Sequence, residues 1–417
     1  MIVAHGNQTF GYSLYLKDRV PHFGVRLSGM LLEVRGRDPV DLDRWIHLAA
    51  TIDPQRRMTL FVGGEEAGRL VAGQLVTQRP REGLNVGADL GGRVGEYDTP
   101  MHFRGLIRRV RVYWGVMDDF YAWCSPRVGP GDFGTTHDRS GPWIVAPGGK
   151  PILRYMTEKP IASKLTADSV ACFHPLCTPS GEVVTAFAPD DHLHHRGVFL
   201  AWYAMQGGQT KADFWGWGRF APTEGRVIET GDWRTEKQED RVTMHVRNHW
   251  LADGAPMIHE DLAATVRPQG PANVVDLTYT LRPTADVTID RSAFGGFCVR
   301  CRNDGEITFT GPDGVVSRPP PHYLKPETDW PAASGYDLSV KLADGKTVGA
   351  AVLDHPQNPP SGWHNVARLG MINPCITAAG PVTIKKGKPL VLRYRLVVHD
   401  GPAPIELLRK LSAEWEK

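Results

Sequence analysis

Apolar and polar positions alternate along most of the chain in short runs, and this pattern predicts strands. From residue 10 to about 116 the runs include YSLYLK, HFGVRL, WIHLAATID, MTLFVGG and LNVGAD, with polar turns such as DPQRR and GGEE between them. The side chains of a strand point to opposite faces in turn, so alternation marks a strand with one face against a core. The first part of the chain is therefore predicted to be an antiparallel β-sandwich.

The same rhythm returns from residue 151 to about 400, in runs such as RVTMHVRNHWL, NVVDLTYTLRP, VGAAVLDH and LVLRYRLVVHD. Between the two parts, residues 118–150 are rich in Gly, Pro, Ser and Asp and show no lasting periodicity, which predicts a linker. The last stretch, PAPIELLRKLSAEWEK, has apolar residues at helical spacing. We expect an all-β protein of two domains, 1–117 and 151–417, the second larger and ending in a short helix.

Length and charge narrow the possible partners. A chain of 417 residues is longer than one core usually supports, which agrees with two domains. Lys and Arg number 48 and Asp and Glu 46, and this balance argues against a general attraction to nucleic acid or anionic lipid. No apolar run approaches the roughly 20 residues that a membrane helix needs. We therefore expect a soluble protein with neither a nucleic acid nor a membrane as partner.

The N-terminus, MIVAHGNQTFGYSLYL, has no basic region followed by a long apolar core and a cleavage site, so no signal peptide is predicted. The compartment stays open on this evidence. A cytoplasmic protein is expected from the chain as it stands, and a periplasmic or extracellular one if an upstream signal peptide is missing from it.

Three histidines fall within four positions in the segment DDHLHHRG, between Asp191 and Arg196. In an extended strand, His192 and His194 would share one face and His195 would point to the other, so only a turn aims all three at one ion. Two interpretations stay open. One is a polar loop whose imidazoles bond backbone groups, and the other is a metal or acid–base site.

Further polar and aromatic residues interrupt the strand pattern near turns of the second domain, where functional sites are usually mounted. They lie mainly in HPLCTPSGEVVT, DFWGWG and LDHPQNPPSGWHNVARLG. A sugar site needs aromatic faces for the C–H side of the ring and planar polar groups for its hydroxyls, although core packing is the competing interpretation for each tryptophan. The expected catalytic residues are Asp191, His192, His194, His195, Arg196, His174 and His364. The expected substrate-binding residues are Asp213, Trp215, Trp217, Glu260, Arg300, His355, Asn358 and Trp363.

Two mechanisms fit these residues. In one, His192 and His194, joined by His174 or His364, hold a divalent metal ion that polarises a sugar carbonyl or carboxylate. In the other, no metal takes part: one histidine takes a proton and a carboxylic acid or a second histidine returns it, as in elimination or epimerisation. Histidines outnumber acids in the distinctive motifs, which favours histidine chemistry.

A glycosidase would instead need two carboxylates across the scissile bond, for which Asp191 and Glu260 are the candidates. The chain has no dinucleotide-binding fingerprint, so neither a nucleotide nor a flavin cofactor is expected. The C-x-x-C pair of Cys298 and Cys301 has no second pair, which argues against a four-cysteine zinc site.

Two family resemblances rest on these motifs. Roughly the first 117 residues resemble the laminin-G-like, concanavalin-A-like jelly roll, through GYSLYL, RWIHLAATID, MTLFVGGEEAG, LNVGAD and FRGLIRRVRVYWGVM. Residues from about 150 to 400 are similar to the PmoA-like family, through HPLCTPSGEVVT, DHLHHRG, DFWGWG, GGFCVRC and DHPQNPPSGWH. The family's label of methane oxygenase is set aside, because methane oxidation of that kind is a membrane process and this chain has no membrane segment.

The resemblances imply a jelly roll followed by a large antiparallel β-sandwich of the kind seen in sugar mutarotases and polysaccharide lyases. They point to carbohydrate through fold analogy, which is weaker evidence than a site. We expect a carbohydrate-active lyase or hydrolase that acts on a glycan or sugar derivative. The alternative is a glycan-binding protein without enzymatic activity.

Overall fold

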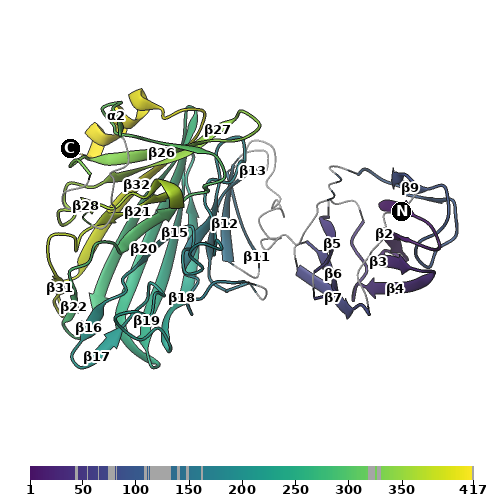
Figure 1. Ribbon diagram of the computed structural model, residues 1–417, viewed down its shortest axis with the longest axis horizontal. Coiled ribbons are helices and arrows are strands. Elements are labelled where there is room, and N and C mark those ends of the chain that lie inside the picture. The colour runs from purple at the N-terminus through teal and green to yellow at the C-terminus, as the bar shows by residue number, and fades with distance from the viewer. Residues whose placement is uncertain are drawn as a thin grey trace. The chain divides into compact units, whose positions relative to one another are not determined.

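The chain divides into two compact units, residues 1–124 and 125–417. The computed structural model describes residues 1–42, 46–53, 55–63, 65–73, 80, 82–107, 110, 112, 133–138, 141–146, 150–160, 163–317, 325 and 330–415. In these ranges nearly all the regular structure is strand, so the all-β prediction is confirmed (Figure 1). None of the helices in the described ranges has the length and apolar character that crossing a membrane requires.

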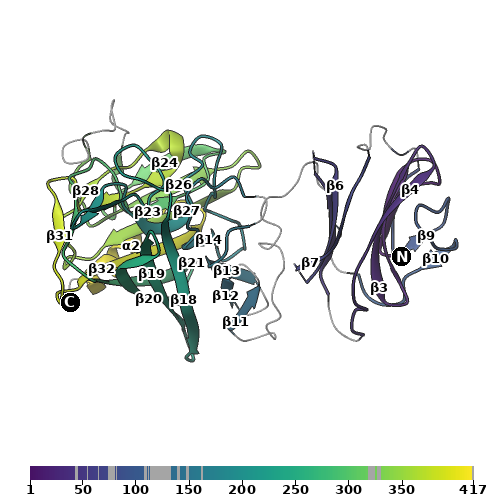
Figure 2. The same cartoon turned by 90° about the horizontal axis from the view of Figure 1, so that it is seen from below.

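The N-terminal unit is a sandwich of two sheets. One sheet has the strand order β4-β3-β2-β1-β8 and the other β5-β6-β7, while β9 and β10 form a separate pair. Figure 2 shows the two sheets facing each other, and Phe23, Val25 and Leu60 belong to the apolar core that both contribute to. The predicted run LIRRVRVYW lies partly outside the described residues. The strands are β1 Val3–Gly6, β2 Gly11–Lys17, β3 Val20–Leu27, β4 Met30–Arg35, β5 Leu48–Ile52, β6 Arg57–Val62, β7 Glu65–Val71, β8 Leu84–Val86, β9 Ala88–Asp89 and β10 Met101–His102.

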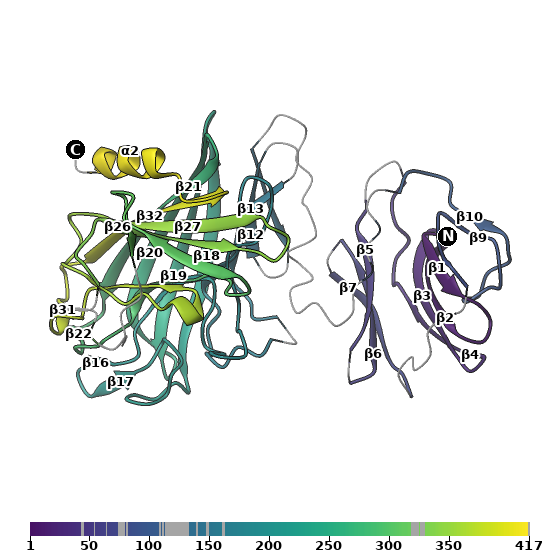
Figure 3. The ribbon, with the colours of Figure 1, turned by 45° about the horizontal axis from the view of Figure 1, so that its top comes forward.

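The C-terminal unit is a larger sandwich of antiparallel sheets of seven and nine strands (Figure 3). Their inner faces share one core: Phe297 of the first sheet stacks on Tyr394 of the second, with ring centroids 3.9 Å apart. The seven-stranded sheet runs, in order, β11 Gly134–Asp138, β12 Gly141–Ala146, β13 Lys150–Met156, β14 Cys172–Leu176, β15 Val198–Ala201, β23 Gly296–Arg300 and β29 Met371–Ile372. The nine-stranded sheet runs β18 Arg226–Lys237, β19 Val242–Ala252, β20 Ala255–Gln269, β21 Ala272–Pro283, β32 Leu390–Asp400, β27 Thr347–Asp354, β26 Gly335–Lys341, β24 Glu306–Thr310 and β25 Val316–Ser317.

Smaller elements complete the C-terminal unit. They are the sheet of β17 Thr210–Ala212, β16 Met205–Gly207, β22 Val287–Ile289 and β31 Val382–Ile384, the pair β28 Gly362–Trp363 and β30 Pro374–Cys375, and the short 3-10 helix η2 Ala367–Leu369.

The structure differs from the sequence analysis in the predicted linker, residues 118–150. Strands β11 and β12 lie inside this range and join the edge of the seven-stranded sheet. Trp143, Ile144 and Val145 of β12 are buried. The run GPWIVA is short and continuously apolar, as expected for a strand buried on both faces, and therefore gives no alternation to detect among the surrounding glycines and prolines.

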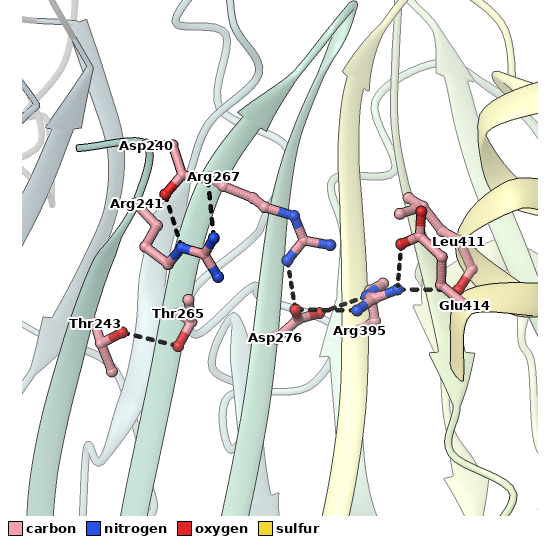
Figure 4. Close-up of polar contacts among 9 residues, drawn as sticks. All are labelled: Asp240, Arg241, Thr243, Thr265, Arg267, Asp276, Arg395, Leu411 and Glu414. Atoms are coloured by element: carbon pink, nitrogen blue, oxygen red, sulfur yellow. Dashed lines mark hydrogen bonds and ion pairs between the residues drawn. The ribbon is translucent and has the colours of Figure 1, made fainter. Parts of the chain in front are cut away.

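The outer face of the nine-stranded sheet is polar where it meets solvent and apolar beneath helix α2, Ile405–Trp415. Leu408 and Leu411 of the helix belong to a separate small core that includes Val274 and Val397 of the sheet. Beside this core, Arg395 donates to Asp276 and to the carbonyl oxygen of Leu411 at 2.9 Å (Figure 4). The charged strand residue therefore ties the end of the helix to the sheet.

A buried ion pair lies on the same sheet. Nε2 of His399 on β32 is 2.7 Å from Oδ2 of Asp337 on β26, and both side chains are fully buried. The strand between them, β27, carries Gly349, where an added Cβ would lie 2.6 Å from Nε2 of His399. Burial lowers the pKa of His399, but the hydrogen bond and charge of Asp337 outweigh it, so the pKa lies above its ordinary value of 6.5.

The Asp337→Asn variant should lose about 3–5 kcal/mol of unfolding free energy at pH 6, because it leaves a buried imidazolium without its counter-charge. A raised folded-state pKa gives stability that is complete below 6.5 and is lost as the pH rises through the folded-state value. The difference between the variant and the natural protein should therefore shrink towards pH 9. Urea unfolding from pH 6 to 9 measures it, and a constant difference would contradict the ion pair.

Candidate functional site

The segment DDHLHHRG forms a loop immediately before β15. The N–H of Ala188 donates to the carbonyl oxygen of His195 at 2.8 Å and closes the loop. Within it, the N–H of His192 donates to the carbonyl oxygen of Pro189, and the N–H of His195 to that of His192, both at 2.9 Å. Two successive turns thus replace extended backbone, so the strand geometry that would have separated the histidines does not apply.

These turns bring three imidazoles together, and we call His192, His194 and His195 the histidine cluster. The rings of His192 and His195 stack with centroids 4.7 Å apart and an interplanar angle of 19°. His194 meets both edge-on, at 5.6 Å from His192 and 4.7 Å from His195. His195 is 3% exposed, whereas 29% of the His192 side chain is exposed. The cluster is therefore open to solvent on the His192 side and closed on the His195 side.

Arg300, the last residue of β23, anchors the cluster through Asp191. Its buried guanidinium donates from Nη2 to both carboxylate oxygens of Asp191, each at 2.8 Å. Nη1 lies 3.4 Å from Nδ1 of His195. A guanidinium can only donate, so Nδ1 of His195 is the acceptor, and the neutral ring carries its proton on Nε2.

Burial keeps the cluster uncharged at neutral pH. Burial, followed by the positive charge of nearby imidazoles and guanidinium groups, lowers the pKa of His194 to about 4. Burial also lowers the pKa of His192, where Asp191 opposes the shift and nearby arginines, including the exposed Arg368, add to it. The pKa of His195 lies well below its ordinary value, chiefly through burial. At pH 7 these rings can accept a proton or a hydrogen bond.

Two expected site residues, Arg196 and Asp213, bond backbone groups. Arg196 is fully buried and donates to the carbonyl oxygens of Phe214 at 2.9 Å and Trp215 at 3.1 Å. The carboxylate of Asp213 accepts the N–H groups of residues 216–218 at 2.6–3.0 Å. Both side chains thus fix the DFWGWG turn beside the histidine cluster.

A strip of aromatic rings leads away from the cluster. Trp215 lies edge-on to His195, with centroids 5.7 Å apart. Phe294 lies 5.8 Å from Trp215 and 5.1 Å from Trp217. His364 follows at 5.5 Å from Phe294. The strip connects DFWGWG with the distant SGWHN segment, as expected for parts of one site.

Sequence reasoning missed three members of this strip. Tyr203 lies 4.8 Å from Phe294, and Phe220, which is 57% exposed, lies 5.4 Å from Trp217. Tyr203 stands in the apolar run VFLAWYAM and Phe220 is a single aromatic residue in a turn-rich stretch, so their types alone give no sign of a site. The glycine pair before Phe297 in AFGGF was the one available signal, because paired glycines often mark close backbone approach.

His174 lies on the strand next to the cluster. Its Nδ1 is 2.9 Å from the hydroxyl of Thr185, and its ring stacks on Phe187 at 5.3 Å. Phe187 forms an isolated bridge with Arg196, at the base of the histidine loop. His174 therefore supports this base from the neighbouring strand.

Three residues of the Pro-rich loop have their contacts elsewhere. His355 packs 4.8 Å from Trp415 of helix α2. Asn358 holds its loop to β32, since its side chain donates to the carbonyl oxygen of Arg393 and accepts its N–H, at 2.7 and 2.8 Å. Trp363 is buried and donates to the carbonyl oxygen of Ala333 at 3.1 Å. All three side chains therefore have structural partners, and these contacts do not join them to the histidine cluster.

Glu260 lies in the core of the sandwich. Its carboxylate accepts hydrogen bonds from Nδ2 of Asn248 at 2.7 Å and Nε1 of Trp250 at 2.8 Å, and 3% of the residue is exposed. Burial raises the pKa of Glu260 to about 7, although both hydrogen bonds favour the charged form. The carboxyl group thus accepts hydrogen bonds from two core donors, which accounts for an acid on the inner face of β20.

The histidine cluster has one feature of a metal site but lacks a full set of ligands among the described residues. Nδ1 of His192 is buried and has no hydrogen-bond partner in the described structure, as a metal ligand would show. Across the described ranges, however, no three His, Cys, Asp or Glu side chains are grouped so that they would hold a metal ion. The cluster as it stands does not fit a three-ligand metal centre, and a metal held by His192 and His194 stays a prediction.

The fold and the cluster define a two-unit, all-β protein with a histidine site in its larger unit. Residues 143–413 match the model of the family described as "Family of unknown function (DUF6807)", and the chain belongs to this family. Residues 1–119 match a model described as "Concanavalin A-like lectin/glucanases superfamily", which confirms the predicted jelly roll. The resemblance of the second part to the PmoA-like family stays a prediction. No curated protein matches the chain in sequence.

Solved structures similar to the chain are distant. A galactose mutarotase related enzyme from Lactobacillus acidophilus shares 8% identity over 64% of this chain and 97% of its own, with a TM-score of 0.31. The GH36 alpha-galactosidase AgaB from Geobacillus stearothermophilus shares 11% over 66% of this chain and 39% of its own, with a TM-score of 0.33. The Slr1438 protein from Synechocystis sp. PCC 6803 shares 12% identity over 66% of this chain and 98% of its own, with a TM-score of 0.27.

The Asp191→Asn variant should lose about 2–3 kcal/mol of unfolding free energy, since the buried Arg300 guanidinium would keep its charge without a bidentate partner. Asp190→Asn is the matched control, because Asp190 is 85% exposed and pairs with the exposed Lys164. Denaturant unfolding at pH 7 compares the two variants. Equal losses would show that the Asp191–Arg300 pair does not anchor the loop.

Proposed function

We propose that the C-terminal unit is a carbohydrate-active enzyme that moves protons on a sugar or sugar derivative, with the histidine cluster as its acid–base group. One observation carries the proposal: three uncharged imidazoles meet a buried, ion-paired arginine at a point that opens to solvent and continues into a strip of aromatic rings. Reaction by elimination or epimerisation, hence a lyase or a related enzyme, is the reaction class favoured.

The charges around the cluster support proton transfer. His192 is the ring nearest to solvent and is uncharged at neutral pH, so it is placed to take a proton from a substrate. Removal of a proton next to a carbonyl or carboxylate leaves negative charge on oxygen. The exposed Arg368 supplies positive charge near the cluster to stabilise it, whereas the charge of Arg300 is already balanced by Asp191.

Hydrolysis by two carboxylates has less support. Asp191 is engaged by Arg300 through both oxygens, and Glu260 is held in the core by Asn248 and Trp250. A glycosidase needs both acids free to face the scissile bond from opposite sides. Because both acids are already engaged by other side chains, acid–base catalysis by the histidines is better supported than hydrolysis by two carboxylates.

The aromatic strip supports a sugar as the ligand. Trp217 and Phe294 are partly buried and Phe220 is exposed, so part of this aromatic surface reaches solvent. The guanidinium of Arg219 lies over the rings of Trp217 and Phe220, at 5.4 and 5.6 Å from their centroids. Aromatic ring faces pack on the apolar C–H side of a pyranose. The lectin and glucanase match of the N-terminal unit agrees with a glycan ligand, as does the PmoA-like resemblance when it is interpreted without its oxygenase label.

The proposal is tested with a panel of polysaccharides and sugar acids in heavy water, followed by absorbance of unsaturated products and by NMR for deuterium exchange at sugar C–H groups. The natural protein should turn over or exchange at least one substrate. The His192→Ala/His194→Ala protein should lose about 10²–10⁴-fold of this rate, the usual contribution of a general acid or base. His245→Ala, a partly exposed histidine elsewhere in the unit, should keep it.

Elemental analysis of tag-free protein purified without chelator separates the two routes. Metal that is lost with His192 and His194 but kept in His245→Ala would direct the assay to metal-assisted chemistry. Full activity in the double variant would overturn the role of the cluster. Binding of a glycan with neither product nor exchange would identify the alternative, a glycan-binding protein without enzymatic activity.

A further inference from the structure

Two histidines face each other on the outer face of the nine-stranded sheet, in a part of the unit that the proposed function does not use. His249 of β19 and His259 of β20 are direct cross-strand partners. Their Nδ1 atoms lie 2.8 Å apart, and the rings stand at 87° with centroids 5.0 Å apart. His259 is exposed and His249 partly so, so solutes can reach both nitrogens.

The spacing of the two nitrogens fits two ligands of one metal ion. Imidazole nitrogens bind divalent transition metals at about 2.0–2.1 Å, so two of them at a right angle are about 2.9 Å apart, against about 3.3 Å in a tetrahedron. The observed 2.8 Å agrees with the right angle. Right-angled nitrogen ligation is typical of Cu²⁺ and Ni²⁺.

The neighbouring residues favour a cation at this point. Glu229 of β18 is the cross-strand partner of His249 on its other side, so an exposed carboxylate stands in the same row. Arg282 follows His259 in that row, but it is ion-paired with Asp261. Gly231 lies at a bulge of β18, next to the Nε2 edge of the His249 ring. Because glycine has no side chain, this edge of the ring is not covered by one.

We propose that His249 and His259 form a two-nitrogen surface site for a divalent transition-metal ion of the Cu²⁺ or Ni²⁺ type, with water in the remaining positions. In the absence of the ion, one ring donates its Nδ1–H to Nδ1 of the other. When the ion binds, that ring loses its Nδ1 proton to water and takes one on Nε2, so both rings bind as neutral imidazoles and no net proton is released. The site is separate from the histidine cluster and does not depend on the proposed function.

The test is titration of the full-length, tag-free protein with Cu²⁺ alone, followed by calorimetry and by electron paramagnetic resonance for nitrogen ligation. One equivalent should bind with two nitrogen ligands. His249→Ala and His259→Ala should each weaken it by about 10²-fold or more, because a chelate exceeds a single ligand by about 10²–10⁴. Circular dichroism checks that each variant is folded.

Two controls make the assignment specific. His245→Ala removes a histidine from the same strand and face, whose Nε2 lies 3.6 Å from Glu236, and should keep the bound Cu²⁺. His192→Ala/His194→Ala should also keep it. Absence of binding, tight binding that survives both His249→Ala and His259→Ala, or equal loss in His245→Ala would overturn the site and leave an ordinary N–H···N hydrogen bond.

Discussion

The alternation of strand side chains between two faces is the constraint on which the C-terminal unit depends. Strands β19 and β20 bury every second residue against the seven-stranded sheet, so apolar residues fill those positions and polar ones the others. Asn248 and Glu260 are exceptions on the inner face, and they are partners of each other. The two side chains satisfy each other there, because a buried polar group without a partner would cost several kcal/mol.

The candidate site lies where that alternation ends. Arg300 is the last residue of β23, and the histidine loop leads into the adjacent strand β15, so one buried charge and one loop meet where these two interior strands end. Asp191 supplies the counter-charge, while Arg196 and Asp213 satisfy backbone groups around it. The partly exposed His192 and the exposed Phe220 pack on His195 and Trp217 and still reach solvent. Such a division between supporting and exposed groups is the usual form of a binding or catalytic site.

Most of the fold was predictable from sequence because periodicity reports which face is buried. The strands around MTLFVGG and NVVDLTYTLRP and the helix at Leu408 and Leu411 were foreseen in this way. The strands of residues 134–146 were not, since a strand buried on both faces shows no alternation. For the site, residue types identified the histidine loop and DFWGWG as candidates. They could not show that the side chains of Asn358 and Glu260 are bonded to structural partners, because that depends on which residues of other strands lie beside them.

The ion pair of His399 and Asp337 has a consequence for how this sequence can vary. The imidazole reaches its partner across β27 only because Gly349 has no side chain beneath it. A residue with a side chain at 349 fits only if His399 is replaced by a smaller residue. That replacement would leave the buried Asp337 without its counter-charge. Among relatives that keep this sheet, the three positions should therefore covary, although 50 residues separate Gly349 from His399 along the chain. Such covariation would reflect one packing constraint and not a shared catalytic task.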